Sequence, residues 1–177
     1  MSTFYLSGGM EYKTNLGSKW RDWLTRGLHE LGHTVVDPVK MEMSESGQPF
    51  QHMLTAWKEA GELGRVREVT RQSLFVRDIR GLYQSDAMVL FYDESVQRGA
   101  GSLSESWEAF RVGKPVYLVT EFPITKVPTW LIGETTEIFP SFELFLEYVT
   151  NHNRVVCDMS AAQKSCDTML AEVHKGL

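Results

Sequence analysis

The chain has 177 residues, 42% of them hydrophobic and 23% charged, and its formal net charge at pH 7 is -5. This length suits one domain with a single core, and the composition indicates a folded chain and argues against a disordered one. The acidic balance argues against a nucleic-acid polymer as partner, because that binding depends on clustered Lys and Arg.

The cysteines and the N-terminus point to a cytoplasmic protein. Cys157 and Cys166 are too few for a disulfide framework, and no neighbouring His or Cys gives them the spacing of a zinc site. The N-terminal stretch MSTFYLSGG reaches its glycines too early for a signal peptide. No apolar run approaches the roughly 20 residues of a membrane span. We therefore expect a cytoplasmic location, no membrane contact and no metal.

The chain opens with the pattern of a strand, a helix and a second strand. Phe4–Leu6 is a short apolar run, and the Ser-Gly-Gly of residues 7–9 closes it as a loop. Apolar residues recur at helical spacing over residues 15–31, and Gly32 ends that helix. The second strand is predicted at residues 33–38.

The middle of the chain holds a long connection and the most hydrophobic run. Residues 38–64 are predicted to be irregular apart from a short helix near 53–60, and a connection of this length is more often functional than idle. A helix is predicted over residues 65–83. The run AMVLFY at 87–92 predicts a central parallel strand buried on both faces.

The strand and helix patterns continue to the C-terminus. The stretch GAGSLSESWEAF at 99–110 predicts a loop of small residues that runs into a helix. A strand is expected at 115–119 and an edge strand at 136–139. Two helices, near 141–150 and 160–174, close the chain.

Strands that alternate with helices indicate a parallel sheet covered on both sides. We predict an α/β fold, doubly wound and flavodoxin-like or Rossmann-like, with a parallel sheet of about five strands and helices on both faces. Residues 1–177 are expected to form one domain, with a core over 3–150 and a C-terminal helical extension over 158–175. In such folds ligands bind beyond the carboxyl ends of the strands.

The paired glycines Gly8 and Gly9 follow the first strand and have two explanations. Glycines at such a point let backbone N–H groups approach a phosphate, or they supply a turn with positive φ. On this motif alone the two stay equally open. A G-x-G-x-x-G spacing and a Walker A lysine are both absent, which disfavours NAD and ATP bound by those motifs.

Two aspartates are candidates for chemistry. Asp78 falls near the border of a predicted core stripe, and by itself it is better explained as a surface carboxylate paired with Arg77 or Arg80. Asp93 ends the third predicted strand, at the edge of the sheet where ligands bind.

Glu105 follows a small-residue loop at the start of a predicted helix. The first turn of a helix offers free N–H groups, which bind anions and hold a carboxylate in its charged form. Ser102 and Glu105 also match the S-x-x-E capping box, a purely structural explanation. A carboxylate nucleophile, a second carboxylate and a small-residue anion loop together suit cleavage of a glycosidic bond, whose oxocarbenium-like transition state is stabilised by negative charge.

These motifs, in this order, resemble the nucleoside 2-deoxyribosyltransferase superfamily, which includes deoxynucleoside 5′-monophosphate N-glycosidases and CMP or hydroxymethyl-CMP hydrolases. The resembling segments are YLSGGM at 5–10, RD at 77–78, SDAMVL at 85–90, GSLSE at 101–105 and GKP at 113–115. The resemblance implies a doubly wound α/β domain, a nucleoside or nucleotide substrate, no cofactor and a homo-oligomer.

The resemblance also implies roles for individual residues. Glu105 would be the nucleophile, Asp78 would bind the substrate or protonate the base, and Tyr5 would position the nucleophile. Asp93 would bind the base or the sugar. The residues implied to contact the sugar or its 5′ end are Ser7, Gly8 and Gly9. Apart from the resemblance, the hydroxyl groups and the cation that a substrate phosphate would want are supplied by Ser7, Arg98, Ser102 and Ser104. Gly101 is also expected to bind substrate.

We therefore expect an enzyme that cleaves the N-glycosidic bond of a nucleoside 5′-monophosphate or a nucleoside, releasing the base or transferring the sugar to another base. The hydroxyl groups and Arg98 near the pocket favour a nucleoside 5′-monophosphate N-glycosidase, with base exchange as the close rival. Residues 41–64 carry no alignable motif, so the base preference is open. One alternative is a phosphoribohydrolase of the lysine-decarboxylase-like type, whose G-x-G-[ST]-x-x-E signature resembles residues 99–105 without its usual preceding Pro-Gly-Gly. Another is a non-catalytic nucleotide-binding or sensing module, in which Glu105 only caps a helix.

Overall fold

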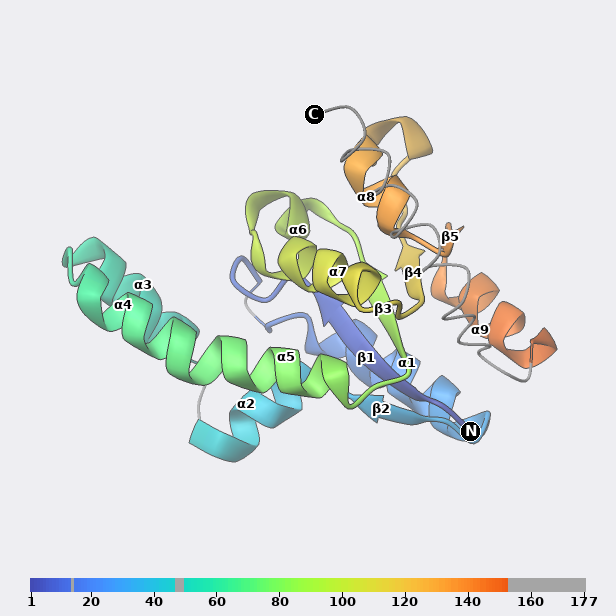
Figure 1. The fold of residues 1–177 in the computed structure, drawn as a ribbon, viewed down its shortest axis with the longest axis horizontal. Coiled ribbons are helices and arrows are strands. Elements are labelled where there is room, and N and C mark those ends of the chain that lie inside the picture. The colour runs from blue at the N-terminus through green and yellow to red at the C-terminus, as the bar shows by residue number, and fades with distance from the viewer. Residues whose placement is uncertain (14, 47–49, 153–177) are drawn as a thin grey trace, which may run out of the picture.

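A computed structural model of the chain describes residues 1–13, 15–46 and 50–152. Its centre is a parallel five-stranded sheet with the strand order β2-β1-β3-β4-β5 (Figure 1). The strands are β1 (Thr3–Gly8), β2 (Thr34–Val36), β3 (Ala87–Phe91), β4 (Val116–Val119) and β5 (Glu137–Phe139). This is the flavodoxin-like order, so the predicted fold class is confirmed, and the direction of winding reverses between β1 and β3.

Helical segments connect all the strands. Those of the first half are α1 (Ser18–Glu30), α2 (Pro38–Ser46), α3 (Gln51–Glu59), α4 (Leu63–Val69), a π-helical turn at Thr70–Phe75 and α5 (Val76–Tyr83). Those of the second half are α6 (Glu94–Arg98), α7 (Gly101–Arg111), a 3-10 turn at Ile124–Lys126, α8 (Thr129–Glu134) and α9 (Phe142–Asn151).

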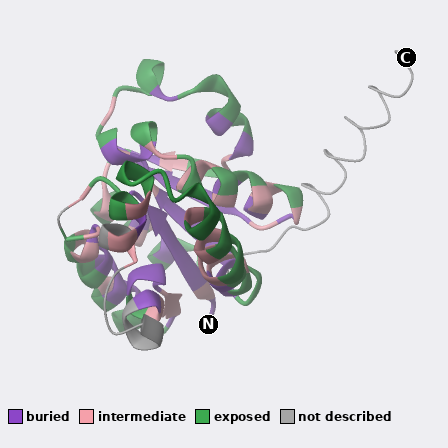
Figure 2. Cartoon of the chain, turned by 90° about the vertical axis from the view of Figure 1, so that its left-hand side faces the viewer, coloured by how far each residue is buried: buried purple, intermediate pink, exposed green. Residues whose placement is uncertain are grey.

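The helices cover both faces of the sheet. Helices α1 and α9 contact each other and pack on one face, whereas α7 packs on the other beside α5 and α8 (Figure 1). Each face has its own apolar core: Leu6 belongs to the α1 side and Tyr5 to the α7 side. Figure 2 shows the buried strands enclosed by helices whose outer surfaces are exposed. Successive residues of β1 therefore serve opposite faces, as the alternation of a strand requires.

The short helix expected near residues 53–60 is confirmed as α3, but the prediction that the rest of 38–64 is irregular is wrong, because Pro38–Ser46 form α2 and α4 begins at Leu63. Asp37 accepts a hydrogen bond from the backbone N–H of Val39 at 3.0 Å, and Pro38 is the first residue of α2. An Asp followed by Pro is a helix-start signal, because the carboxylate caps the helix and proline suits its first position. Val39 and Leu54 are buried, which fixes α2 and α3 against the core.

The remaining differences concern short or terminal segments. The helix predicted over 65–83 is one continuous helical run over 63–83 that contains the π-helical turn. Helices α6 and α8 were not predicted, because each has six residues or fewer and shows little periodicity. The predicted extension at 158–175 and both cysteines lie outside the described residues.

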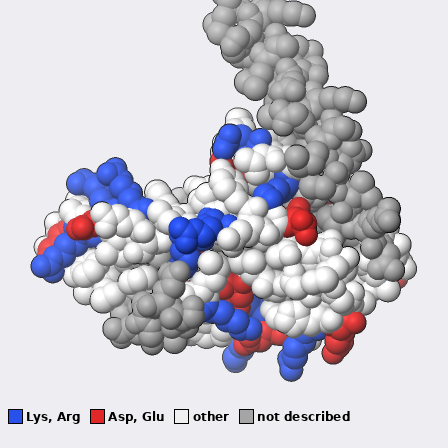
Figure 3. Space-filling model, turned by 60° about the horizontal axis from the view of Figure 1, so that its bottom comes forward, with Lys and Arg blue, Asp and Glu red and all other residues white. Residues whose placement is uncertain are grey.

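The described surface and helices bear on possible large partners. Figure 3 shows Lys and Arg side chains intermixed with Asp and Glu over the face that it draws. In the described part of the chain, no helix combines the length and the apolar character that crossing a bilayer would need.

Candidate active site

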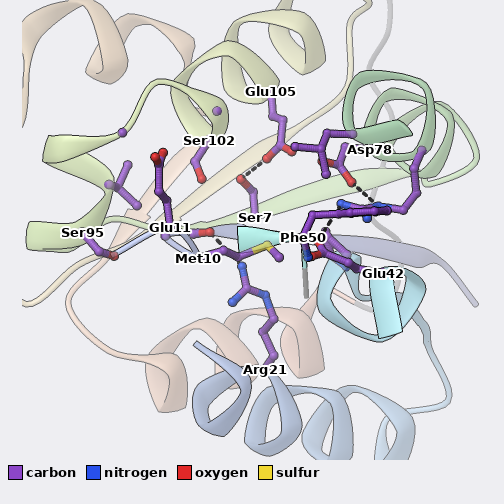
Figure 4. Close-up of a pocket in the computed structure, with 18 of the residues that line it drawn as sticks. Ser7, Met10, Glu11, Arg21, Glu42, Phe50, Asp78, Ser95, Ser102 and Glu105 are labelled. Atoms are coloured by element: carbon purple, nitrogen blue, oxygen red, sulfur yellow. Dashed lines mark hydrogen bonds and ion pairs between the residues drawn. The ribbon is translucent and has the colours of Figure 1, made fainter. Parts of the chain in front are cut away.

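Tyr5 and Ser7 lie two residues apart on β1, and their side chains therefore point to the same face of the sheet. That face is covered by α7, which carries Glu105. The Tyr5 hydroxyl donates a hydrogen bond to Oε1 of Glu105 at 2.8 Å. The Ser7 hydroxyl donates one to Oε2 at 2.5 Å (Figure 4). Both carboxylate oxygens are thus held by hydroxyl groups from β1.

The capping box expected at Ser102 and Glu105 does not form. Helix α7 begins at Gly101, and its N-cap residue is Ala100, which offers no side-chain acceptor. Ser102 therefore lies inside the first turn, and Glu105 is the fifth helical residue. In a capping box the Glu105 carboxylate would accept a hydrogen bond from the backbone at the helix start. Here it accepts hydrogen bonds from the hydroxyl groups of Tyr5 and Ser7 instead.

Glu105 is also less readily ionised than its place near a helix start suggests. Burial, followed by the negative charge of Asp78, raises its pKa from 4.5 to about 7. The hydrogen bonds from Ser7 and Tyr5 and the charge of Arg21 lower the pKa without compensating for these effects. Protonated and ionised forms of Glu105 therefore coexist near neutral pH.

The same surroundings keep Tyr5 neutral. Its side chain is fully buried, and burial together with the nearby charge of Glu105 raises its pKa well above 10.0. Tyr5 is therefore a phenol donor to Glu105 across the physiological pH range.

Asp78 lies on α5 and lines the same pocket as Glu105. Arg77 donates from Nε to Oδ1 of Asp78 at 2.8 Å, and its Nη2 lies 3.2 Å from Oε2 of Glu42 (Figure 4). The sequence-based explanation of Asp78 as the partner of Arg77 is therefore half right. Arg77 is only 3% exposed, so this ion pair belongs to the pocket wall rather than to the surface.

The pocket has a volume of about 150 Å³ and lies at the carboxyl end of β1, where the direction of winding reverses. It adjoins a second hollow of about 390 Å³, and the two share Asp78 and Glu105. The proposed site residues that line the first hollow are Ser7, Gly8, Gly9, Asp78, Gly101, Ser102 and Glu105. Ser104 lines only the adjoining one.

Gly8 and Gly9 are required by close packing, not by backbone angle. Neither is among the residues with positive φ. A Cβ atom on Gly9 would lie 1.8 Å from Oγ of Ser95, and one on Gly8 would lie 2.8 Å from the Trp20 ring. The glycines thus let the loop after β1 lie against α1 and α6.

Arg21 is the main pocket residue that sequence reasoning missed. It is fully buried and donates to the backbone carbonyls of Leu6, Leu16 and Gly8 at 3.4, 2.8 and 2.8 Å. Figure 4 shows it rising from α1 beneath the pocket. A sequence signal existed, because Arg21 stands three residues before a core leucine, Leu24, on the apolar face of its helix.

Other missed residues come partly from residues 41–64, which carry no alignable motif, and partly from the loop after β1 and the π-helical turn. Glu11 and Glu42 contribute further carboxylates to the pocket, and the apolar part of the wall comes from Phe50, Leu54 and Leu74. Leu74 lies within the π-helical turn, a feature that is frequent at functional sites. Within residues 1–13, 15–46 and 50–152, no three His, Cys, Asp or Glu side chains are grouped to hold a metal ion.

Asp93 and Arg98 do not line this pocket; they line a neighbouring hollow beyond the ends of β3 and β4, which shares Ser95 with it. Asp93 is the N-cap of α6 and accepts from the N–H groups of Ser95 and Val96 at 2.9 and 3.2 Å. It also forms an ion pair with Lys13. The guanidinium of Arg98 stacks over a tyrosine ring in the loop after β1. The role of Asp93 as a ligand for base or sugar stays a prediction.

Comparison with known proteins identifies the fold. A scan against protein-family models finds no match, and a search of curated protein sequences finds none. A 2-deoxyribosyltransferase from Bacillus psychrosaccharolyticus superposes with a TM-score of 0.60 at 17% identity, over 83% of this chain and 92% of that one. A 2-desoxiribosyltransferase from Leishmania mexicana gives 0.55 at 14%, over 87% and 100%. The chain therefore has the deoxyribosyltransferase fold that the sequence motifs predicted.

A third solved structure is the CMP N-glycosidase BcmB from Clostridium botulinum. It aligns over 83% of this chain and 97% of that one at 13% identity, with a TM-score of 0.47. That score lies below the level at which a likeness supports a fold assignment, so the assignment depends on the two transferases.

Proposed function

We propose that the protein cleaves the N-glycosidic bond of a nucleoside or a nucleoside 5′-monophosphate, with Glu105 as the nucleophile, and passes the sugar to water or to another base. The observation that carries this proposal is the placement of Glu105. Its carboxylate is held by Tyr5 and Ser7 in a pocket that also contains Asp78, at the edge of the sheet where this fold binds ligands. The shared fold with two deoxyribosyltransferases supports it.

In the first step, an ionised Glu105 oxygen attacks C1′ of the sugar, and the electron pair of the C1′–N bond leaves with the base. The base gains a proton, which Asp78 or water supplies. In the second step, water or an acceptor base attacks C1′ and releases the Glu105 carboxylate, and the proton that the attacking group loses passes to Asp78 or to solvent. Tyr5 and Ser7 hold the carboxylate in place for the attack, and the negative charge of Glu105 stabilises the oxocarbenium-like transition state.

The non-catalytic alternative required Glu105 to act as a helix cap, and its hydrogen bonds to Tyr5 and Ser7 show a different use of the carboxylate. The structural neighbours do not favour the phosphoribohydrolase alternative. Homo-oligomer formation and a cytoplasmic location stay predictions, the first of which light scattering on the purified protein would test.

The direct experiment incubates the protein with a panel of nucleosides and 5′-monophosphates, with and without an acceptor base, and separates the products by chromatography. We expect released base or an exchanged nucleoside from the wild type and none from Glu105→Gln. If no member of the panel yields free or exchanged base at high enzyme concentration, the proposed function is wrong.

A further inference from the structure

Carboxylates surround the pocket from four different segments. They belong to Glu11 in the loop after β1, Glu42 on α2, Asp78 on α5 and Glu105 on α7 (Figure 4). The cationic residues in the same lining are two, Arg21 and Arg77. The charge available to a ligand therefore depends on whether these two arginines are already engaged.

Arg21 is committed to the protein. Three of its nitrogens donate to backbone carbonyls, and its Nε lies 3.7 Å from Oδ1 of Asp37, which is itself buried. An incoming phosphate would have to replace these hydrogen bonds with its own. The carbonyls of Leu6 and Gly8 are buried, so water could not replace Arg21 as their hydrogen-bond donor. Leaving them without a donor would therefore cost more free energy than it would for exposed carbonyls.

Arg77 is engaged by two carboxylates, those of Asp78 and Glu42, so its charge is already exceeded by that of its partners. Its remaining nitrogen, Nη1, has no hydrogen-bond partner but is sealed from solvent. At the rim of the adjoining hollow, Lys58 is paired with Glu11. Arg77 and Lys58 thus each already bind a carboxylate of the pocket.

The start of α7 is the feature that would favour an anion, because Gly101 and Ser102 bring its first turn to the pocket wall. A helix N-terminus carries about half a positive charge. A 5′-phosphomonoester brings about -1.5 to -2 charges at neutral pH. The helix terminus is too weak to balance both that charge and the surrounding carboxylates.

We infer that the pocket selects an uncharged nucleoside over the corresponding 5′-monophosphate, an inference that rests on the proposed function. Sugar hydroxyl groups are hydrogen-bond donors, and the partly exposed carboxylate of Glu11 can accept such bonds. Two residues that the sequence assigned to a phosphate are used elsewhere. Ser7 is bound to Glu105, and Arg98 lines the neighbouring hollow, where its guanidinium lies over a tyrosine ring.

The test compares kcat/KM for matched pairs, each a nucleoside and its own 5′-monophosphate, at low ionic strength. We expect the nucleoside to be favoured at least tenfold, roughly the effect of one uncompensated like-charge contact. Added salt should narrow the ratio, because screening weakens repulsion at the open side of the pocket. A monophosphate favoured over its nucleoside would overturn the inference.

A charge variant gives an independent readout. Glu11→Gln removes one carboxylate and releases Lys58, and both changes should move the ratio several-fold toward the monophosphate. The matched control is Glu59→Gln, which removes an exposed carboxylate next to Lys58 on α3 that does not line the pocket. The control should leave the ratio unchanged. If the two variants move the ratio equally, the carboxylates of the pocket do not set the selectivity.

Failure of the proposed function is distinguishable from failure of this inference. If neither member of any pair is cleaved, the same pairs are titrated into the wild-type protein in a calorimeter. Tighter binding of the nucleoside then supports the inference. Tighter binding of the monophosphate, or binding of neither, overturns it.

Discussion

Two carboxylates at the same edge of the sheet have opposite surroundings. Asp93 follows β3, accepts hydrogen bonds from two backbone N–H groups of α6 and forms an ion pair with Lys13. Glu105 meets two hydroxyl groups of β1 and faces the negative charge of Asp78. The pKa of Asp93 is lowered, because the bonds from Lys13 and Ser95 outweigh its burial, whereas burial and Asp78 raise the pKa of Glu105 to about 7.

Position at the ligand edge does not by itself fix how readily a carboxylate ionises. The hydrogen bonds and the ion pair of Asp93 within the protein favour its charged form. Burial and Asp78 disfavour the charged form of Glu105, and groups perturbed in this way are common at functional sites. Four measurements test this difference between the two carboxylates.

The largest expected effect is on turnover. Glu105→Gln should reduce kcat by at least roughly 10³-fold, because a neutral amide cannot form the glycosyl ester. Steady-state kinetics on whichever substrate the panel identifies would measure it, with circular dichroism to check the fold. Near wild-type turnover with an intact fold would mean that another residue is the nucleophile.

The second prediction concerns stability against pH. Between pH 4.5 and about 7 the folded protein binds more protons at Glu105 than the unfolded chain, so its contribution to stability falls as pH rises through this window. The unfolding free energy of Glu105→Gln, measured relative to that of the wild type, should therefore rise by on the order of 2–3 kcal/mol from pH 5 to pH 8. Urea denaturation at the two pH values measures it, and an equal effect at both would show that Glu105 has an ordinary pKa.

The third prediction concerns Asp93. Because its folded-state pKa is lowered, its contribution is present above pH 3.8 and is lost as pH falls below that value. Asp93→Ala should cost about 0.5–2 kcal/mol of unfolding free energy at pH 7, as loss of an N-cap does, and should change kcat/KM little. Asp93→Ser, which keeps a capping oxygen, is the control. A large loss of kcat/KM with little loss of stability would instead make Asp93 a substrate ligand.

The smallest expected effect is a displaced pH profile. Attack requires ionised Glu105, so kcat/KM should rise with pH through about 7. Ser7→Ala removes a hydrogen bond that lowers the pKa of Glu105. The rise of kcat/KM with pH should therefore occur at a pH roughly one unit higher in this variant. Ser7→Thr keeps the hydroxyl and should restore the profile, and Tyr5→Phe should move it less than Ser7→Ala. An unmoved profile in Ser7→Ala would mean that the hydroxyl does not tune Glu105.

The sequence predicted the sheet well and the connection at residues 38–64 badly. Each core strand is a short apolar run bounded by polar or glycine residues, a signal that needs no tertiary information. Within that connection the sequence predicted α3, near residues 53–60, but not α2, which mixes apolar and polar residues without clear periodicity and is fixed by burial of Val39. The Asp37-Pro38 start of α2 was readable from the sequence, and its meaning depended only on capping chemistry.

The order of the elements, the loop of small residues and the place of Glu105 near a helix start follow from local sequence, because each depends on neighbours within a few positions. The groups that surround each carboxylate are brought together by the fold. The hydrogen bonds from Tyr5 and Ser7 to Glu105 join residues 100 and 98 positions apart, and the pocket cations come from α1 and α5. Burial and charge depend on distance in space rather than on distance along the chain, so the pKa of a carboxylate is set by the fold.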